Sequence, residues 1–200
     1  MVRHARLATA LFFSVAFTLP AAGCRSRDAE PLRDPVRLES YDFGGDFSLT
    51  AHDGRPFRLS EQRGKVVLLF FGYASCPDVC PTTLSTVKQV EEQLGTRRGQ
   101  LLTVFVSVDP ERDTPPVLKQ YVDHFGINVV AATGAKPAID AIVAQYKAHY
   151  AIVPSDSALG YLVEHTSILY LIDQEGRVRY LFRYGDPADF IIEGVTQLLR

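Results

Sequence analysis

The sequence predicts a single α/β domain built on a mixed β-sheet with helices on both faces. Two near-continuous apolar runs, 66–71 and 101–108, are typical of strands that are covered on both faces. Apolar residues at helical spacing follow each run, as in units of two parallel strands joined by a crossover helix. The tight-turn sequence 173–176 separates two further strands, 166–172 and 178–184, and predicts an antiparallel hairpin that makes the sheet mixed.

The remaining elements follow from turn and helix signals in chain order. Asp53-Gly54 lies between the segments 47–51 and 55–59, which predicts an added N-terminal β-hairpin. Pro81 suits the first turn of a helix that ends near Leu94, because the N–H that proline lacks has no helical partner there. We expect in addition a turn of helix capped by Ser60, a helix from Thr114-Pro115 to Phe125, a short strand over 128–131, a helix over 138–150, an irregular stretch or a small excursion over 152–162 and a last helix from Asp186-Pro187 to Leu199.

The N-terminus has the layout of a secretory signal: basic residues, an apolar stretch over 7–19, and small residues before Cys24. The apolar stretch is too short for a comfortable membrane-spanning helix. Ala21-Ala22-Gly23-Cys24 resembles a bacterial lipobox, which implies cleavage before Cys24 and a lipid on its sulfur. Ordinary signal cleavage that leaves a spare thiol, or an uncleaved anchor, are the alternatives.

These features predict three segments: a lipoprotein-type signal peptide over 1–23, a flexible tether over 24–45 and the folded domain over 46–200. The protein is then exported and anchored in a bacterial membrane, with its domain on the periplasmic or extracytoplasmic side. The 200-residue chain has a formal net charge of −2 and no basic run, so nothing indicates a nucleic-acid partner. Once Cys24 is assigned to the anchor, Cys76 and Cys80 remain as a pair in a compartment that permits a disulfide.

Cys76 and Cys80 lie where the first buried strand meets the first helix. A helix N-terminus favours thiolate over thiol, and thiolate is the form that attacks disulfides and binds soft metals. Pro77 disfavours helix at Cys76, which leaves a loop that can close or open. Thioredoxin-type oxidoreductases have two residues between their cysteines; the three found here favour a metal site over plain redox exchange.

The element order, with cysteines at the first strand–helix junction, resembles the thioredoxin fold. In that fold the strand 166–172 lies beside the strand 66–71, so the residues before it face the cysteine loop. Thioredoxins carry a cis-proline there, whereas this chain has His165. Two thiolates and one imidazole form a soft, low-coordinate set that suits Cu(I), and Cu(II) fits if a water or carboxylate is added. Zinc usually requires a fourth ligand.

Three motifs are similar to those of the SCO/SenC family of copper proteins, and the similarity runs from about Phe47 to the C-terminus. The resemblance implies a thioredoxin-like fold with copper bound by Cys76, Cys80 and His165. It also implies a part in assembling the binuclear copper centre of cytochrome c oxidase, by giving copper to its copper-bearing subunit, by reducing that site's cysteines, or both. The motifs are Phe71-Gly-Tyr-x-x-Cys76-Pro-Asp-Val-Cys80-Pro, Ser107-Val-Asp109-Pro-Glu-Arg-Asp113-Thr-Pro115 and Glu164-His165-Thr166.

Other functions compete for the cysteine pair. The main one is an exported thiol–disulfide oxidoreductase without an essential metal, in which Cys76 and Cys80 form the redox pair. A structural disulfide and a peroxiredoxin-type peroxidase are weaker alternatives, and His165 after the paired cysteines argues against the peroxidase. For His165 itself, the alternative is a loop histidine that bonds to backbone.

Three aspartates are candidates for supporting roles. Asp78, between the thiols, could tune their charge, meet a partner or stabilise the turn. Asp109 and Asp113 could support the metal ligands or contact a partner, although Asp113 or Thr114 also suits the cap of the following helix. We assign no role to His52, His124 and His149, and expect His124 and His149 to lie on the solvent faces of helices.

Overall fold

The computed structural model describes residues 34–199. Cys24, the predicted signal peptide and the first part of the predicted tether lie outside the described residues. Among the helices of the described chain, none combines the length and the apolar character needed to cross a bilayer.

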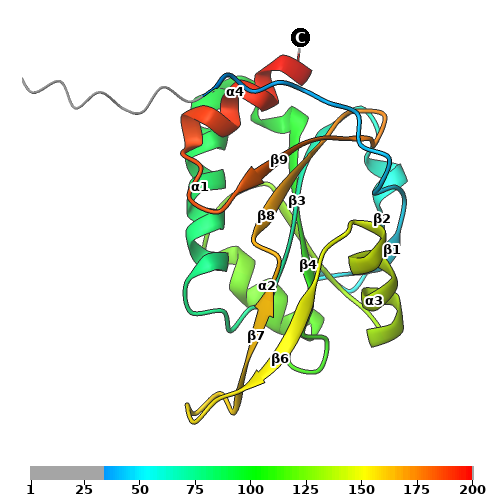
Figure 1. The fold of residues 1–200 in the computed structure, drawn as a ribbon, viewed down its shortest axis with the longest axis vertical. Coiled ribbons are helices and arrows are strands. Elements are labelled where there is room, and N and C mark those ends of the chain that lie inside the picture. Colours follow the sequence, from blue (N-terminus) through cyan, green and yellow to red (C-terminus); the bar gives the residue numbers. More distant parts are fainter. Residues whose placement is uncertain (1–33, 200) are drawn as a thin grey trace, which may run out of the picture. The chain divides into compact units, whose positions relative to one another are not determined.

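A seven-stranded mixed sheet forms the centre of the domain, in the order β2-β1-β5-β4-β3-β8-β9 (Figure 1). Strands β3, β4 and β5 are parallel, β8 runs antiparallel to β3, and β1 runs antiparallel to both β2 and β5. The predicted mixed sheet is therefore confirmed. The strands are β1 (Ser48–Ala51), β2 (Pro56–Arg58), β3 (Val66–Gly72), β4 (Leu101–Ser107), β5 (Val129–Thr133), β8 (Ile168–Ile172) and β9 (Val178–Arg183).

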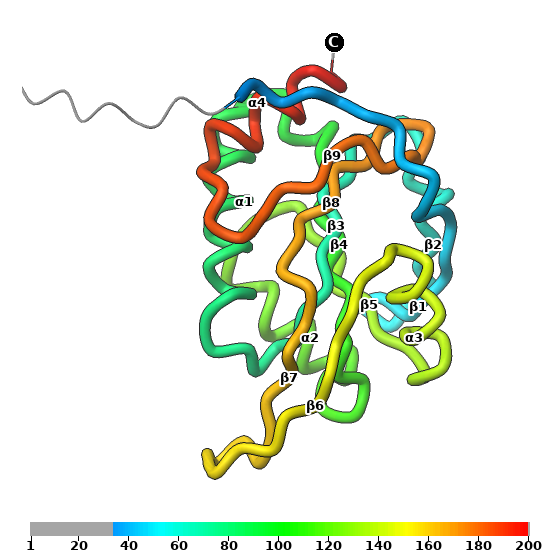
Figure 2. Tube along the Cα trace, in the orientation of Figure 1, coloured from blue at the N-terminus to red at the C-terminus, as the bar shows by residue number. Residues whose placement is uncertain are grey.

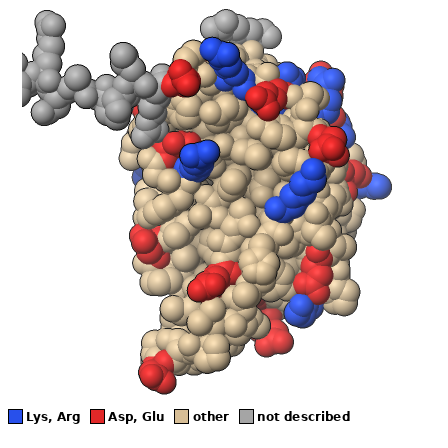
Figure 3. Space-filling model, in the orientation of Figure 1, with Lys and Arg blue, Asp and Glu red and all other residues tan. Residues whose placement is uncertain are grey.

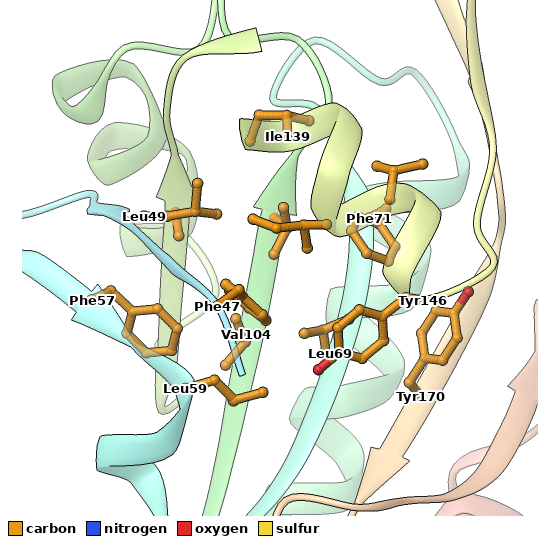
Figure 4. Packing of buried hydrophobic residues seen from close by; sticks show 14 of the residues in the cluster. Phe47, Leu49, Phe57, Leu59, Leu69, Phe71, Val104, Ile139, Tyr146 and Tyr170 are labelled. Atoms are coloured by element: carbon orange, nitrogen blue, oxygen red, sulfur yellow. The ribbon is translucent and has the colours of Figure 1, made fainter. Parts of the chain in front are cut away.

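Helices cover both faces of this sheet, as predicted (Figure 2). One face packs against α1 (Val79–Leu94), α2 (Pro115–Asp123) and α4 (Ala188–Leu198), and the other against α3 (Lys136–Gln145). Figure 4 shows the cluster on the α3 face, where the Tyr146 ring lies edge-on to the rings of Phe71 and Tyr170, at 6.0 and 5.7 Å. Every residue of β3 and β4 is buried, because these central strands are covered on both faces. Two short 3₁₀ turns, Leu59–Gln62 and Gly95–Gln100, complete the connections.

The stretch predicted to be irregular is a two-stranded antiparallel sheet of β6 (Tyr150–Pro154) and β7 (Tyr161–His165). Figure 1 shows this hairpin projecting beyond the end of the main sheet at which α1 begins. Most of its residues are half-buried or exposed, and its apolar run, 150–153, is shorter than those of β3 and β4. His165 is consequently the last residue of β7, and the predicted strand 166–172 begins only at Ile168.

Helix α3 is displaced from its predicted bounds of 138–150. It begins at Lys136, which places Pro137 in the first turn, and it ends at Gln145. Lys147 adopts a positive φ of 52°, a left-handed conformation that the helix cannot continue through. His149 therefore lies outside any helix, although it is exposed as expected.

The domain begins before the predicted boundary at residue 46. Val36 is buried with 4% of its surface exposed, and its backbone N–H donates to Glu193 on α4. Farther along, the backbone N–H groups of Glu39 and Tyr41 donate to carbonyls of β9. Residues 36–45 are thus part of the folded domain, and the prediction of a tether through Gly45 is wrong for them. Their apolar side chains are too widely spaced for a periodic signal.

Candidate functional site

The structure brings together the three residues that the sequence indicated as metal ligands. Cys76 lies in the loop after β3, Cys80 in the first turn of α1, and His165 at the end of β7. The two sulfurs and a ring nitrogen of His165 all lie within 4.8 Å of one another, and both cysteines are free thiols. Cys80 Sγ lies 3.6 Å from His165 Nε2. The pairing of β8 with β3 produces this meeting, because it carries the end of β7 to the carboxyl end of β3.

The two thiols differ in environment. Cys76 is partly exposed, and its pKa falls to about 4, chiefly through the hydrogen bond from the Cys80 thiol, with further contributions from His165 and from the N–H groups of Asp78 and Cys80. That last N–H, at the start of α1, lies 3.5 Å from Cys76 Sγ, as expected for a sulfur at a helix N-terminus. Hydrogen bonding to Cys76 and burial raise the pKa of Cys80. The pair therefore holds one thiolate readily, and the second forms when a cation replaces its proton.

The ring of His165 is held on two sides. Nδ1 lies 3.2 Å from the carbonyl oxygen of Thr166, and the ring stands edge-on to the buried ring of Tyr73, with centroids 5.9 Å apart. A proton on Nδ1 that is donated to this carbonyl leaves the Nε2 lone pair directed at the cysteines. Two sulfurs and this nitrogen form a donor set that fits a soft metal ion.

Gly72 makes room for Cys80. A Cβ atom at Gly72 would lie 2.5 Å from Cys80 Sγ and 2.6 Å from the ring of Phe105. No side chain larger than hydrogen fits there without displacing the sulfur. Gly72 is not among the residues that the sequence indicated, although a glycine at the end of a buried strand is a signal of close approach.

Asp113 does not cap α2, contrary to one of the two predicted roles. Its Oδ2 accepts hydrogen bonds from the Ser107 hydroxyl at 2.6 Å and from the Ala74 N–H at 2.9 Å. Thr114 occupies the N-cap position without a side-chain bond. Asp113 therefore ties the end of β4 to the loop that carries Cys76.

The three candidate aspartates differ in solvent exposure. Asp109 and Asp113 have 3% and 0% of their surface exposed, which argues against direct contact with a partner. Asp78 is exposed and accepts a hydrogen bond from the Tyr184 hydroxyl at 3.1 Å. Asp78 thus links the cysteine loop to the segment that follows β9.

The other histidines of the described chain do not join the cluster. His52 accepts a hydrogen bond from the Ala131 N–H through Nδ1, and His124 is exposed at the end of α2. His149 pairs through its backbone with Thr166.

Two pockets meet at His165. One, of about 290 Å³, is lined by Cys76, His165 and Tyr73 and opens to solvent. The second, of about 280 Å³, is largely apolar and lies between α1, β8 and the segment after β9. On the face seen in Figure 3, acidic and basic side chains surround a broad uncharged area. Because the pocket lined by Cys76 and His165 opens to solvent, the candidate site is accessible from outside.

Comparison with known proteins agrees with this geometry. The SCO1/SenC family model matches residues 36–200. An SCO2-like protein of Rickettsia felis is 37% identical over 166 residues, which are 81% of this chain and 81% of that protein. The copper-bound structure of Bradyrhizobium japonicum ScoI superposes with a TM-score of 0.72 at 32% identity, covering 78% of this chain and 99% of that one. An SCO1/SenC family lipoprotein from Bacillus anthracis gives a TM-score of 0.69 at 25% identity, over 84% of this chain and 100% of that one. The chain belongs to the SCO1/SenC family.

Proposed function

We propose that this protein is a copper metallochaperone that binds copper through Cys76, Cys80 and His165. Its proposed role is to supply copper to the binuclear copper site of cytochrome c oxidase, to keep that site's thiols reduced, or both. The observation that carries the proposal is the convergence of three soft-metal donor atoms within 4.8 Å of one another. Family membership and the copper-bound state of Bradyrhizobium japonicum ScoI support copper as the metal.

The chemistry of the donors favours Cu(I), for which thiolate sulfur is a preferred ligand. Three protein ligands beside a solvent-accessible pocket leave one side open to a ligand of the recipient. Copper is the cargo of such a protein. It would leave by ligand exchange, as donors of the recipient replace the cysteines one at a time.

Copper binding by the reduced protein tests the ligand assignment. We expect one Cu(I) per wild-type chain, and a loss of affinity of more than about 100-fold in Cys76→Ser and Cys80→Ser, because loss of an outer partner alone costs metal sites about 10–100-fold. His165→Ala should weaken binding while retaining both thiols. Competition with a Cu(I) chelator measures all four proteins. Replacement of His124, an exposed histidine outside the cluster, is the matched control and should leave affinity unchanged.

Wild-type affinity in His165→Ala would contradict the assignment of this residue as a ligand. Absence of tight copper in the fully reduced wild type would contradict the metallochaperone itself and would favour the second candidate function.

That second candidate is a thiol–disulfide oxidoreductase, and the unequal environments of the two thiols favour it. The thiolate of partly exposed Cys76 would attack a partner's disulfide, forming a mixed disulfide and releasing one partner thiolate. Buried Cys80 would then attack Cys76 Sγ, which yields a Cys76–Cys80 disulfide and releases the second partner thiolate. The partner gains two electrons, and the proton of Cys80 passes to the released thiolates. His165→Ala should spare this exchange, whereas either cysteine variant should abolish it.

We also propose membrane attachment through lipidated Cys24 after export. The Bacillus anthracis member of the family is a lipoprotein, which supports this part of the proposal. Burial of acyl chains contributes about 0.8 kcal/mol per methylene, so two chains hold a protein stably. The wild type, expressed in a bacterium with its signal intact, should incorporate labelled fatty acid, and Cys24→Ser should not. Equal labelling of the two proteins, or no labelling of the wild type, would contradict lipidation of Cys24.

A further inference from the structure

The hairpin that carries His165 forms no backbone ladder with the main sheet in the described chain. Strands β6 and β7 pair with each other, and an isolated two-stranded sheet is marginally stable in water. Val163 is its buried residue, in the core cluster on the α3 face. His165 stands at the last position of β7, so its distance from the cysteines depends on how this hairpin is held. Contacts at the opposite end of β7 therefore bear on the site.

Arg112 makes those contacts. Its Nη1 donates to the carbonyl oxygens of Leu159 and Tyr161, at 3.1 and 3.0 Å. Its guanidinium carbon lies 3.6 Å from the centre of the Tyr161 ring, close enough for a cation–π interaction. Arg112 thus contacts both the backbone and the Tyr161 ring at the start of β7.

The carboxylate of Asp109 completes this arrangement. Its Oδ2 accepts from Arg112 Nε, and its Oδ1 accepts from the Tyr161 hydroxyl at 2.8 Å. The Asp109 side chain is 2% exposed and that of Arg112 is 23% exposed, so solvent screens this ion pair weakly. Both carboxylate oxygens are engaged, which fixes the Arg112 and Tyr161 side chains relative to each other.

The same turn also holds the cysteine side of the site. Asp113 bonds the N–H of Ala74, two residues before Cys76. Within the turn, the N–H groups of Arg112 and Asp113 donate to the carbonyl of Asp109. Tyr73 adds a second connection, because its ring lies 5.7 Å from the Arg112 guanidinium and edge-on to His165.

We infer that the turn 109–113 sets the separation of His165 from the cysteines, and that Arg112 is a positioning residue that acts on copper through His165. This inference rests on the proposed copper function. Among the described residues Arg112 contacts no proposed ligand, so its effect on His165 passes through the β7 backbone and the Tyr73 ring.

The first test needs no metal. Amide hydrogen exchange of the reduced, copper-free protein should show faster exchange over 150–165 in Arg112→Gln than in the wild type. Arg177→Gln is the matched control, because Arg177 also pairs with a buried aspartate, Asp173, in the turn between β8 and β9. Equal exchange over the hairpin in Arg112→Gln and the wild type would overturn the inference, whatever the protein's function.

The second test is a cycle with His165. Arg112→Gln should lower Cu(I) affinity by about tenfold in the wild-type background, as loss of outer partners does at other metal sites, and should change it little in His165→Ala. An equal loss in both backgrounds would overturn positioning through His165, and so would no loss in either. If the wild type itself bound no copper, the proposed function would be wrong. The hydrogen-exchange result would still show whether Arg112 holds the β6–β7 hairpin.

Arg112→Lys is a second variant that keeps the inference testable if Arg112→Gln does not fold. A lysine retains the charge beside Asp109 but lacks the planar fork that reaches two carbonyls. We expect it to exchange faster than the wild type over the hairpin and to fold with wild-type spectroscopic signatures. Wild-type exchange and wild-type copper affinity in Arg112→Lys would show that a positive charge beside Asp109 is enough to hold the hairpin. The two hydrogen bonds from Arg112 to backbone carbonyls would then not be required.

Discussion

Replacing Gly72 by alanine is expected to weaken copper binding and to destabilise the fold together. The added Cβ would lie 2.5 Å from Cys80 Sγ and 2.6 Å from the Phe105 ring, so at least one of these groups must move. Cys80 and Phe105 are both fully buried, and overpacking of such a site costs about 1–3 kcal/mol. Displacement of the sulfur also alters its 3.6 Å approach to His165, so we expect Cu(I) affinity to fall by at least about tenfold.

Urea denaturation and chelator competition measure the two effects of Gly72→Ala. Gly99→Ala is the matched control, because Gly99 has open space around the position of a Cβ and does not have a positive φ. It should leave both quantities unchanged. A Gly72→Ala protein with wild-type stability and wild-type affinity would show that the packing around Cys80 yields without cost.

Local signals in the sequence were sufficient for the central elements. The continuous apolar runs predicted β3 and β4 almost to the residue, since strands covered on both faces need no polar side. Pro81 indicated the start of α1 within two residues, because the helix begins at Val79 and Pro81 falls in its first turn. The convergence of His165 with the cysteines followed from likeness to a known fold, and the antiparallel pairing of β3 with β8 produces it.

The parts that were missed depend on contacts between distant residues. Arg112 donates hydrogen bonds to the carbonyls of Leu159 and Tyr161, 47 and 49 residues away. The sequence near Arg112 does not indicate its partners, and the sequence near Leu159 and Tyr161 does not indicate Arg112. The β6–β7 hairpin depends on such contacts in addition to the packing of Val163, Tyr150 and Tyr161 on the core. Residues 36–41 pack on β9 and α4, more than 130 residues later in the chain. Residues 42–45 pack on the end of α3 and the residues after it, 101–105 residues later.

Asp113 provides the prediction with the largest effect on stability. In Asp113→Ala, the Ala74 N–H and the Ser107 hydroxyl lose their shared acceptor in a buried site. Each buried donor left without a partner costs about 1–3 kcal/mol, so we expect the free energy of unfolding to fall by about 2–6 kcal/mol. The loop before Cys76 loses its tie to β4 in this variant, and copper affinity should therefore fall as well.

Asp113→Asn separates the hydrogen bonds from the charge. An amide oxygen in the place of Oδ2 still accepts the hydrogen bonds from Ala74 and Ser107. The amide nitrogen takes the place of Oδ1, which has no hydrogen-bond partner in the described structure. Burial raises the pKa of Asp113, so the folded chain retains a proton that the unfolded chain releases. The stability that this group contributes is present below the ordinary carboxyl range and is lost as pH rises through the folded-state pKa. The wild type should therefore lose stability relative to Asp113→Asn from about pH 4 upward.

Urea denaturation of the reduced, copper-free proteins over a pH series measures this difference. Asp140→Asn is the contrasting control, since hydrogen bonds from Tyr150 and Lys136 lower the pKa of that exposed carboxyl and give any pH effect the opposite sign. A wild type that gains stability relative to Asp113→Asn as pH rises would show that the folded protein prefers the ionised carboxylate. In that case the charge of Asp113, and not only its two hydrogen bonds, would hold the cysteine loop in place.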